Sequence, residues 1–375
     1  MKDNKEILIV GAGISGITLG EKLAKKGYKI IIIDRRSHIG GNCYDFINED
    51  GILAHEYGPH IFHTGDKGVW DYLSRFTQWR KYEHKVLGYI DGKYVPIPFN
   101  LNSLGALFPL EKARRLEKKL IDVFGLGGKV PILELKKSDD NDLKELADYI
   151  YEKVFLHYNE KQWGLRPEEI DPAVSGRVPV FVSCDDQYFQ DKYQGIPIQG
   201  YTEMFAKMIA NDNMQVLLNT DLNDFGDIGG FDAVFYTGPI DEFFNYKHGK
   251  LDYRSIKMEF KTCDWESYQP AAVVNYPNDN NYTRITEFKK LTGQKNEKTA
   301  IGFEYPGTAG FLAYPVLNER NKEIYLEYKR EADNLADKGI YFVGRLAEYK
   351  YYDMDDAISN VLNFFDIIVQ SNGRI

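Results

Sequence analysis

The sequence of 375 residues predicts an α/β fold, in which a doubly wound domain with a parallel sheet carries an inserted helical domain and an antiparallel β-sheet domain. Residues 6–34 fit one complete βαβ unit, which is how a doubly wound sheet begins. Residues from about 101 to 175 have the helical apolar period, and short β-rich segments with turns follow Val178 and fill 251–311. These patterns indicate a chain of several domains.

The βαβ unit consists of two apolar runs with a helical segment between them. The first run, 7–10, ends at a glycine-rich turn, and Gly27 marks the end of the helix that follows. The second run, 29–34, holds four consecutive isoleucines, which is typical of a parallel strand buried on both faces. Two later segments, 231–239 and 340–345, are expected to return as strands of the same sheet. We therefore expect this domain to be discontinuous.

The helical segment contains a recognisable helix start. Asp142 and Glu145 are three residues apart and predict a capping box before a run of apolar residues at helical spacing. The acidic stretch 138–142 is expected to form the preceding loop.

The composition limits the partners and the location of the protein. The net charge of -9 and the lack of a block of Lys and Arg argue against a nucleic-acid binder. No run reaches the roughly 20 apolar residues that a membrane span needs, and the apolar run 7–10 is too short for a secretory leader. Three cysteines without CxxC spacing predict neither a disulfide framework nor a zinc cluster. We expect a cytoplasmic protein without a metal site.

The turn after the first strand has the chemistry of a dinucleotide site. Gly11, Gly13 and Gly16 form a GxGxxG pattern between a strand and a helix, where backbone amides and the helix dipole meet a pyrophosphate. Asp34, at the end of the second strand, is placed to accept the adenosine ribose hydroxyls. The alternative is a tight turn without a ligand. The order of strand, helix, strand and acid favours the dinucleotide site.

The residues that follow favour FAD over NAD. Residues 34–42 read DRRSHIGGN, and Arg36 with Gly40 and Gly41 gives an RxxxGG arrangement. This arrangement resembles the FAD-binding branch of these domains, so FAD is the expected cofactor.

Six further motifs resemble one family. They are GPHIFHT at 58–64, YNEKQWG at 158–164, DKYQGIP at 191–197, YTGPID at 236–241, YTRITE at 282–287 and GRLAEYKYYDMD at 344–355. In this order they are similar to bacterial UDP-galactopyranose mutases. The resemblance implies an isomerase that interconverts UDP-galactopyranose and UDP-galactofuranose for cell-surface polysaccharide biosynthesis. It also implies FAD, active in its reduced form, and a flavin N5–sugar adduct without net redox change.

The resemblance and the sequence patterns together give the expected domains. The FAD-binding domain is expected to take 1–84, 197–245 and 336–375, the helical domain with a mobile loop 101–176, and the antiparallel sheet domain 85–100, 177–196 and 246–335.

Two arginines are expected to hold the UDP phosphates and to act in catalysis. Arg177 lies in a segment rich in Gly and Pro, the composition of a loop that opens and closes over a site, and the resemblance implies that it is the lid arginine. Arg284 lies on a predicted strand where Tyr282, Arg284 and Thr286 share one face, and the resemblance implies the second phosphate contact. The alternatives are an exposed loop arginine and a strand arginine in a structural ion pair.

Several aromatic residues fall inside the family motifs. A phenol can stack on uracil and hydrogen-bond a phosphate, and the resemblance implies such contacts for Tyr158, Tyr188, Tyr314 and Tyr351. It also implies that Trp163 borders the sugar. For an isolated tyrosine, packing in the core is the ordinary alternative.

The remaining implied residues lie near the flavin. His60 and His63 are three residues apart without a third ligand at metal distance, so zinc is not expected. The resemblance implies that both lie near the isoalloxazine ring, with His63 among the catalytic residues; satisfied loop histidines are the alternative. Asp353 is implied to contact substrate and flavin, and an acid there could equally cap the helix that begins near residue 355. The residues implied for the FAD site are Gly11, Gly13, Ser15, Gly16, Asp34, Arg35, Arg36, Gly41, Asn42, His60, Arg345, Tyr352 and Asp353.

Three other functions remain open at this point. A flavin oxidoreductase of the amine-oxidase-like group shares the cofactor and the fold, and a non-catalytic nucleotide-sugar binding protein shares the UDP contacts. A mutase acting on UDP-N-acetylgalactosamine shares the same phosphate and uridine contacts, since a few pocket residues decide the hexose. A homodimer is also left open.

Overall fold

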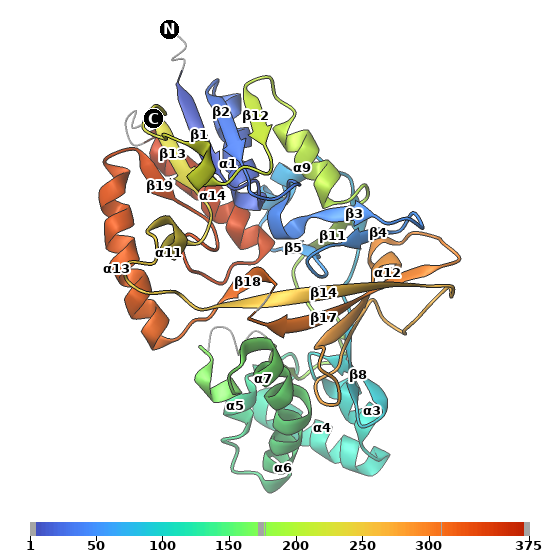
Figure 1. The fold of residues 1–375 in the computed structure, drawn as a ribbon. Coiled ribbons are helices and arrows are strands. Elements are labelled where there is room, and N and C mark those ends of the chain that lie inside the picture. Colours follow the sequence, from blue (N-terminus) through green and yellow to red (C-terminus); the bar gives the residue numbers. More distant parts are fainter. Residues whose placement is uncertain (1–4, 172–175, 177, 309, 371–375) are drawn as a thin grey trace.

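The computed structural model describes residues 5–171, 176, 178–308 and 310–370. Figure 1 shows three parts, one below the other: a parallel sheet with its helices at the top, two long strands across the middle and a group of helices at the bottom.

The upper part contains a five-stranded parallel sheet with the order β12–β2–β1–β13–β19. Its strands are β12 (Met214–Leu217), β2 (Lys29–Ile33), β1 (Glu6–Val10), β13 (Ala233–Tyr236) and β19 (Ile340–Phe342). The order runs outward from β1 in both directions, which is the doubly wound arrangement. The predicted α/β fold class is confirmed, and both predicted return segments form strands of this sheet.

Helices cover this sheet on one face mainly. They are α1 (Ile14–Lys25), α9 (Tyr201–Ile209) and α14 (Met354–Gln370), while α10 (Leu222–Phe225) lies on the other face. Helices α1 and α14 pack on the sheet through a buried cluster that includes Leu19, Phe235 and Val361. The opposite face packs on the short helix α10 and on apolar side chains of the segment that follows it, such as Phe231.

The middle part is a seven-stranded sheet with the order β18–β14–β17–β16–β15–β7–β8. Its strands are β18 (Phe311–Pro315), β14 (Tyr253–Cys263), β17 (Thr299–Gly307), β16 (Arg284–Glu287), β15 (Val273–Asn275), β7 (Val86–Ile90) and β8 (Lys93–Ile97). All neighbours are antiparallel except β15 and β7, which pair in parallel. The sheet predicted as antiparallel is therefore mixed, because two segments far apart in the chain meet side by side.

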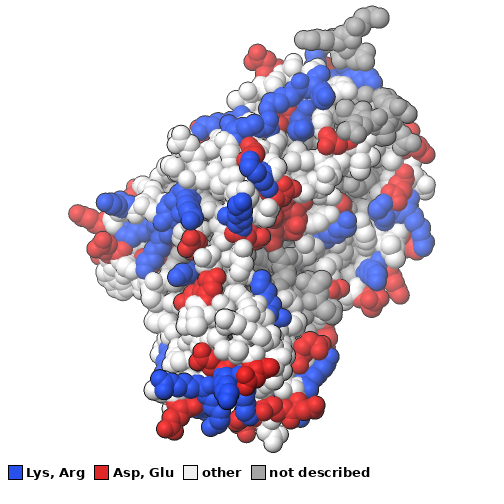
Figure 2. Space-filling view, turned by 180° about the vertical axis from the view of Figure 1, so that it is seen from behind, with Lys and Arg blue, Asp and Glu red and all other residues white. Residues whose placement is uncertain are grey.

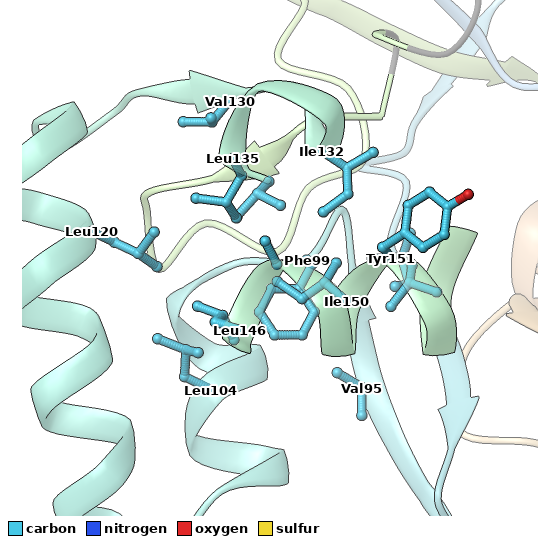
Figure 3. Close-up of a cluster of buried hydrophobic side chains, with 14 of the residues drawn as sticks. Val95, Phe99, Leu104, Leu120, Val130, Ile132, Leu135, Leu146, Ile150 and Tyr151 are labelled. Carbon is cyan, nitrogen blue, oxygen red and sulfur yellow. The ribbon is translucent and has the colours of Figure 1, made fainter. Parts of the chain in front are cut away.

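The lower part is a group of helices around one buried apolar cluster. They are α3 (Leu101–Leu107), α4 (Leu110–Phe124), α5 (Ile132–Leu135), α6 (Asn141–Ile150), η2 (Tyr151–Leu156), α7 (His157–Trp163) and η3 (Pro167–Glu169). Figure 3 shows Phe99, Leu120 of α4, and Leu146 and Ile150 of α6 converging. These side chains hold the group together without any contribution from the parallel sheet.

The start of α6 differs from the prediction. Its N-cap is Asp140, whose carboxylate accepts the N–H of Leu143 at 3.1 Å. The predicted capping box of Asp142 and Glu145 is wrong, because Asp142 already lies in the first turn and pairs with Lys119 on α4 at 2.8 Å.

Helix α6 continues through η2 into α7 without a break. The middle section η2 has π-helical hydrogen bonding. Such wide turns occur often at functional sites. Here the wide turn separates Leu146 and Ile150, which face the helical cluster, from Tyr158 and Gln162 further along.

Small sheets link the larger parts. They are β3 (Asp45–Ile47) with β4 (Leu53–His55), β5 (Phe62–Thr64) with β11 (Tyr193–Pro197) and β6 (Trp79–Lys81), and β9 (Lys129–Val130) with β10 (Val180–Phe181). Residues 177–196 were expected in the sheet domain, yet the described strands β10 and β11 pair with these small sheets rather than with the seven-stranded one. The proposed domain boundaries stay a prediction.

Five shorter or peripheral elements complete the described chain. They are η1 (Gly41–Cys43), α2 (Lys67–Leu73), α11 (Ile240–Phe243), α12 (Phe288–Thr292) and α13 (Glu319–Ala336). Among the described residues, no helix is both long and apolar enough to span a bilayer. Figure 2 shows Lys and Arg side chains mixed with Asp and Glu over the face opposite to that of Figure 1.

Candidate functional site

Two cavities lie side by side and share part of their walls. The smaller, of about 260 Å³, opens at the carboxyl ends of β1, β2 and β13, where ligands of doubly wound sheets bind. The larger, of about 760 Å³, lies between α7, the seven-stranded sheet and the start of α14. The residues that line both are His60, Arg345, Asp353 and Met354. The two cavities therefore meet at these four residues.

Two glycines let the backbone of the first turn pack closely at the smaller cavity. Gly11 has a φ of +114°, and a Cβ there would lie 2.1 Å from Oγ1 of Thr237. A Cβ on Gly16 would lie 1.9 Å from the carbonyl oxygen of Gly11. No side chain fits at either position. The GxGxxG pattern thus brings the first turn of α1 against β1, with its amides at the cavity.

Asp34 supports this turn. Its Oδ2 accepts the N–H of Ala12 at 2.7 Å, and its Oδ1 accepts the N–H of Arg36 at 2.8 Å. An ionised carboxylate has about four acceptor positions, so two remain for other donors. Since Asp34 also lines the smaller cavity, the structure is compatible with the predicted ribose contact and adds a role in holding the turn.

Arg36 provides the best test of whether this cavity suits a dinucleotide. Its Nη2 donates to Oδ1 of Asn42 at 2.9 Å, and the guanidinium lies over the ring of Tyr57 at 4.7 Å. Its Nη1 is buried and makes no hydrogen bond within the described chain. A buried, unpaired N–H of a cation is costly unless an acceptor arrives. A pyrophosphate is such an acceptor, so the residues present fit the predicted cofactor.

The other predicted cofactor residues divide into two groups. Those that line the smaller cavity are Gly11, Gly13, Ser15, Asp34, Arg35, Arg36, Gly41, Asn42, His60, Arg345 and Asp353. Arg35 already donates to Oε1 of Glu242 at 2.7 Å, an interaction at the rim. Gly16 does not line the smaller cavity, but it allows α1 to pack closely against the backbone of Gly11. Tyr352 lines neither cavity, and its hydroxyl donates to Oε1 of Glu348 at 3.2 Å.

Arg345 lies where the two cavities join. Its Nη1 donates to the carbonyl oxygen of Ala313 at 3.2 Å, and its Nη2 donates to the carbonyl oxygen of Tyr352. Its guanidinium also lies 5.7 Å from the ring centroid of Tyr314 and 5.9 Å from that of Tyr351. These contacts fix a positive charge at the junction.

Three aromatic side chains form one wall of the larger cavity. The ring centroids of Trp163 and Tyr314 are 5.6 Å apart, those of Trp163 and Tyr351 are 5.8 Å apart, and those of Tyr314 and Tyr351 are 5.4 Å apart. They come from α7, β18 and the segment before α14, so three distant stretches of the chain meet here. Tyr158 and Tyr188 line the same cavity. All five predicted aromatic residues are thus brought together.

Arg284 places a second cation in the larger cavity. It faces Glu304 directly across β16 and β17, and its Nε lies 3.2 Å from Oε1 of that residue. Burial lowers the pKa of Arg284, but Glu304 and then Tyr158 more than offset this, so the pKa stays above its ordinary value. The pair has ion-pair distance without hydrogen-bond geometry. Arg284 therefore both forms an ion pair with Glu304 and lines the larger cavity, although the sequence alone left these roles as alternatives.

His63 is held firmly beside the junction. Its Nδ1 lies 2.9 Å from Oδ2 of Asp191, and its ring stacks on Phe189 with centroids 3.6 Å apart. Its Nε2 lies 3.9 Å from Oδ2 of Asp353. The ring orientation is therefore set on both edges and one face.

His60 is also fixed, by a different set of contacts. Its Nδ1 bonds the carbonyl oxygen of Gly58 at 2.9 Å, and its backbone N–H donates to Nδ1 of His55 at 3.0 Å. Burial and then His55 lower the pKa of His60 to about 3, so its ring is neutral near pH 7.

Comparison with known proteins decides the family. The family model described as UDP-galactopyranose mutase matches residues 153–351, more than half of the chain. The chain belongs to this mutase family. A model of the NAD(P)-binding Rossmann-like domain matches residues 9–76, which contain the glycine turn. The protein is accordingly an isomerase of a family that uses a flavin cofactor and nucleotide-sugar substrates.

Relatives of the mutase extend over nearly its whole length. A probable UDP-galactopyranose mutase of Klebsiella pneumoniae is 34% identical, over 98% of this chain and 96% of the relative. A dTDP-fucopyranose mutase of Escherichia coli is 32% identical, over 98% of this chain and 99% of the relative. A crystal structure of reduced UDP-galactopyranose mutase has a TM-score of 0.75 at 15% identity, covering 99% and 96% of the two chains. The last match shows the shared fold.

Several residues in or beside the larger cavity were not predicted from the sequence. They are His84, Phe189, Asp191, Asn275 and Glu304. Phe189 and Asp191 lie at the edge of the DKYQGIP motif, so the motif could have drawn attention to them. His84 and Glu304 lie outside every motif, because their positions follow from strand register and not from local spacing. The predicted lid arginine, Arg177, lies outside the described residues.

We expect Arg36→Met to weaken flavin binding at least fivefold, because the variant removes the buried N–H that fits a pyrophosphate. The ratio of flavin to protein absorbance, and titration of the apoprotein with FAD, would measure this. Arg320→Met removes an exposed arginine paired with Asp252 and is the control. Wild-type flavin affinity in Arg36→Met would contradict the assignment of the smaller cavity.

Stability should fall in acid because buried histidines resist protonation. Burial, followed by Arg284 and His63, lowers the pKa of His84 to about 3, and burial lowers that of His55 to about 4. An unfolded histidine titrates near 6.5. Between these values the folded chain binds fewer protons than the unfolded chain, so stability present above pH 6.5 is lost as the pH falls through this window.

His84→Gln should therefore make the pH dependence less steep, by up to about 1.4 kcal/mol per pH unit. Urea unfolding of wild type and variant at pH 7, 6 and 5 would show it. His157→Gln, at an exposed position, is the control. Parallel curves for wild type and His84→Gln would refute the expected contribution.

Proposed function

We propose that this mutase interconverts UDP-galactopyranose and UDP-galactofuranose, with FAD in the smaller cavity and the nucleotide sugar in the larger one. The observation that carries the proposal is the shared wall of His60, Arg345, Asp353 and Met354. A flavin ring at the end of a bound dinucleotide and a sugar at the end of a bound UDP would meet there. The reaction needs this arrangement, because cofactor and anomeric carbon must be in contact.

Reduced flavin, when bound, supplies an electron-rich N5 as a nucleophile toward the anomeric carbon and is returned unchanged, so the isomerisation has no net redox change. The chain's own task is then to bind, orient and shield. Ring contraction requires that UDP leaves the anomeric carbon, that O4 replaces O5 there, and that UDP returns.

Arg284 is assigned to the diphosphate of the leaving group. Its cationic form is secured by Glu304, and Tyr158 lies in the same cavity. A guanidinium matches two phosphate oxygens at once, so it holds UDP in place after the bond to the sugar breaks. The second phosphate contact is proposed for Arg177.

The wall of Trp163, Tyr314 and Tyr351 is assigned to the sugar side. Their closely spaced rings leave little room for bulk water beside the anomeric carbon. Exclusion of water favours return of UDP over hydrolysis of the activated sugar. His63, fixed by Asp191 and Phe189, lines the larger cavity beside Asp353 and is assigned to orienting the reacting groups.

UDP-galactose is the proposed substrate, and two related nucleotide sugars are its competitors. The name of the dTDP-fucopyranose mutase among the relatives indicates a substrate of the same overall design, with deoxythymidine in place of uridine and a methyl group in place of the sugar's hydroxymethyl group. UDP-N-acetylgalactosamine differs only at C2. A cytoplasmic location and a homodimer stay predictions.

The decisive test compares the oxidised and the reduced enzyme. Oxidised protein should bind UDP-galactose and convert almost none of it, since only the reduced ring has an electron-rich N5. After dithionite reduction, chromatography should show UDP-galactofuranose over many turnovers from one reduction event. The same assay with dTDP-fucose and UDP-N-acetylgalactosamine ranks the substrates. One product per reducing equivalent would support the oxidoreductase instead, and equal rates in both redox states would exclude N5.

A second test addresses Arg284. Arg284→Met should lower kcat/KM at least a hundredfold, because it removes the buried cation opposite the diphosphate and leaves Glu304 unpaired. Flavin content should stay at the wild-type level, since Arg284 lines only the larger cavity. Steady-state kinetics and flavin absorbance measure both quantities. Loss of flavin with retained affinity for UDP would show that Arg284 has been assigned to the wrong ligand.

A further inference from the structure

The ammonium group of Lys161 in α7 donates all its hydrogen bonds to backbone carbonyls of one loop. Its Nζ donates to the carbonyl oxygens of Tyr276 at 2.5 Å, Asn280 at 3.0 Å and Tyr282 at 3.4 Å. An ammonium group has three N–H donors, so the side chain is saturated. Lys161 does not line either cavity. Its charge therefore serves the protein rather than a ligand.

The loop that Lys161 holds connects β15 with β16. Residues of this hairpin that line the larger cavity are Asn275, Pro277 and Arg284. Arg284 is the first residue of β16 and lies two positions after Tyr282, which accepts from Lys161. The loop that Lys161 holds therefore leads directly into β16, whose register with β17 places Arg284 opposite Glu304.

The helix that carries Lys161, α7, forms the wall of the larger cavity that faces the β15–β16 hairpin. Its residues that line the same cavity are Tyr158, Asn159, Gln162 and Trp163. The last turn of α7 is held in addition by Arg254 of β14, whose Nε donates to the carbonyl oxygen of Gln162 at 2.8 Å and whose Nη2 donates to that of Lys161 at 2.9 Å. Lys161 is therefore the link from an anchored helix to the hairpin that bears Arg284.

A weaker tie joins the same two walls. Nδ2 of Asn278 donates to the carbonyl oxygen of Lys153 in η2 at 3.1 Å. This is one neutral hydrogen bond, whereas Lys161 makes three charge-assisted ones. Removal of Lys161 would leave three carbonyls of the loop without this donor, while β15 and β16 stay paired with β7 and β17 and Asn278 keeps its bond to η2.

We infer that Lys161 is a positioning residue for the nucleotide sugar: it sets the separation of Tyr158 and Arg284, so that both act on one UDP molecule. The inference rests on the proposed function, because UDP is the ligand that these two walls would hold. It assigns to Lys161 no contact with substrate or cofactor. Its effect is on the preorganisation of the binding site, which lowers the cost of binding.

The test uses Lys161→Met in the flavin-loaded enzyme, because methionine fills similar space without a donor. Titration with UDP by calorimetry should show a dissociation constant at least tenfold higher than in wild type. KM for UDP-galactose should rise by a similar factor, while kcat at saturation stays within about threefold and flavin content is unchanged. Lys161→Gln, which keeps two N–H donors, should have a dissociation constant for UDP between those of wild type and Lys161→Met.

Lys289→Met is a matched control. Lys289 of α12 is buried and its Nζ donates to the backbone carbonyl oxygens of Asn296 at 2.5 Å and Lys298 at 2.9 Å. It lines neither cavity. This variant removes the same type of interaction and should lower the melting temperature to a similar extent, with unchanged affinity for UDP.

The outcomes separate this inference from the proposed function. If wild type binds UDP and Lys161→Met binds it within twofold, the inference is wrong and the function stands. If Lys289→Met weakens UDP binding as much as Lys161→Met does, general destabilisation explains the effect and the inference is also wrong. If Lys161→Met does not fold, the affinity of Lys161→Gln decides in the same way. If wild type does not bind UDP, the proposed function itself fails.

Discussion

The larger cavity depends on the pair of Arg284 and Glu304, which keeps a guanidinium charged inside the protein. Taking either ion out of water alone costs several kcal/mol. The two residues stand directly opposite each other on neighbouring strands, so the strand register itself pairs them. Burial raises the pKa of Glu304, although Arg284 opposes this. Arg284 therefore offsets part of the cost of burying this carboxylate, and its guanidinium still lines the cavity.

The same pair constrains the histidine loop. Gly58, with a φ of +93°, lies so near that a Cβ there would be 3.3 Å from Oε2 of Glu304. The chain therefore passes close behind the carboxylate before it presents His60 and His63 at the junction of the cavities. The Arg284–Glu304 pair and the loop that carries His60 and His63 are therefore packed against each other.

The sequence allowed the fold class and the nucleotide turn to be predicted because both depend on local spacing. The strand, the glycines and the acid at Asp34 lie within about thirty residues, and their order has few structural readings. The N-cap of α6 was predicted two residues too late. Several acidic residues in a row satisfy the same pattern, and only the structure shows that the helix begins after Asp140. The family resemblance brought the five aromatic residues into consideration, although Tyr188 and Tyr314 lie outside the quoted motifs, and the structure shows that all five share one cavity.

Pairings across the chain could not be predicted in the same way. Glu304 meets Arg284 because β16 pairs with β17 in one register. Asp191 meets His63 because the segment before β11 lies beside β5. Spacing along the sequence reveals neither pairing. The parallel pairing of β15 with β7 was missed for the same reason. Sequence patterns predict whether a segment is a helix or a strand, whereas its neighbours in the sheet are determined only when the strands pair.

The π-helical section η2 makes the length of its stretch matter more than its composition. The wide π turn already holds one residue more than an α-helical turn would. A residue inserted between Tyr151 and Leu156 would therefore turn all that follows by about 100°, and Tyr158 and Gln162 would leave the cavity wall. Loss of one residue there would instead close the wide turn as α-helix and keep both side chains in place. One continuous helix can in this way serve a core at one end and a cavity wall at the other, with the wide turn setting the angle between them.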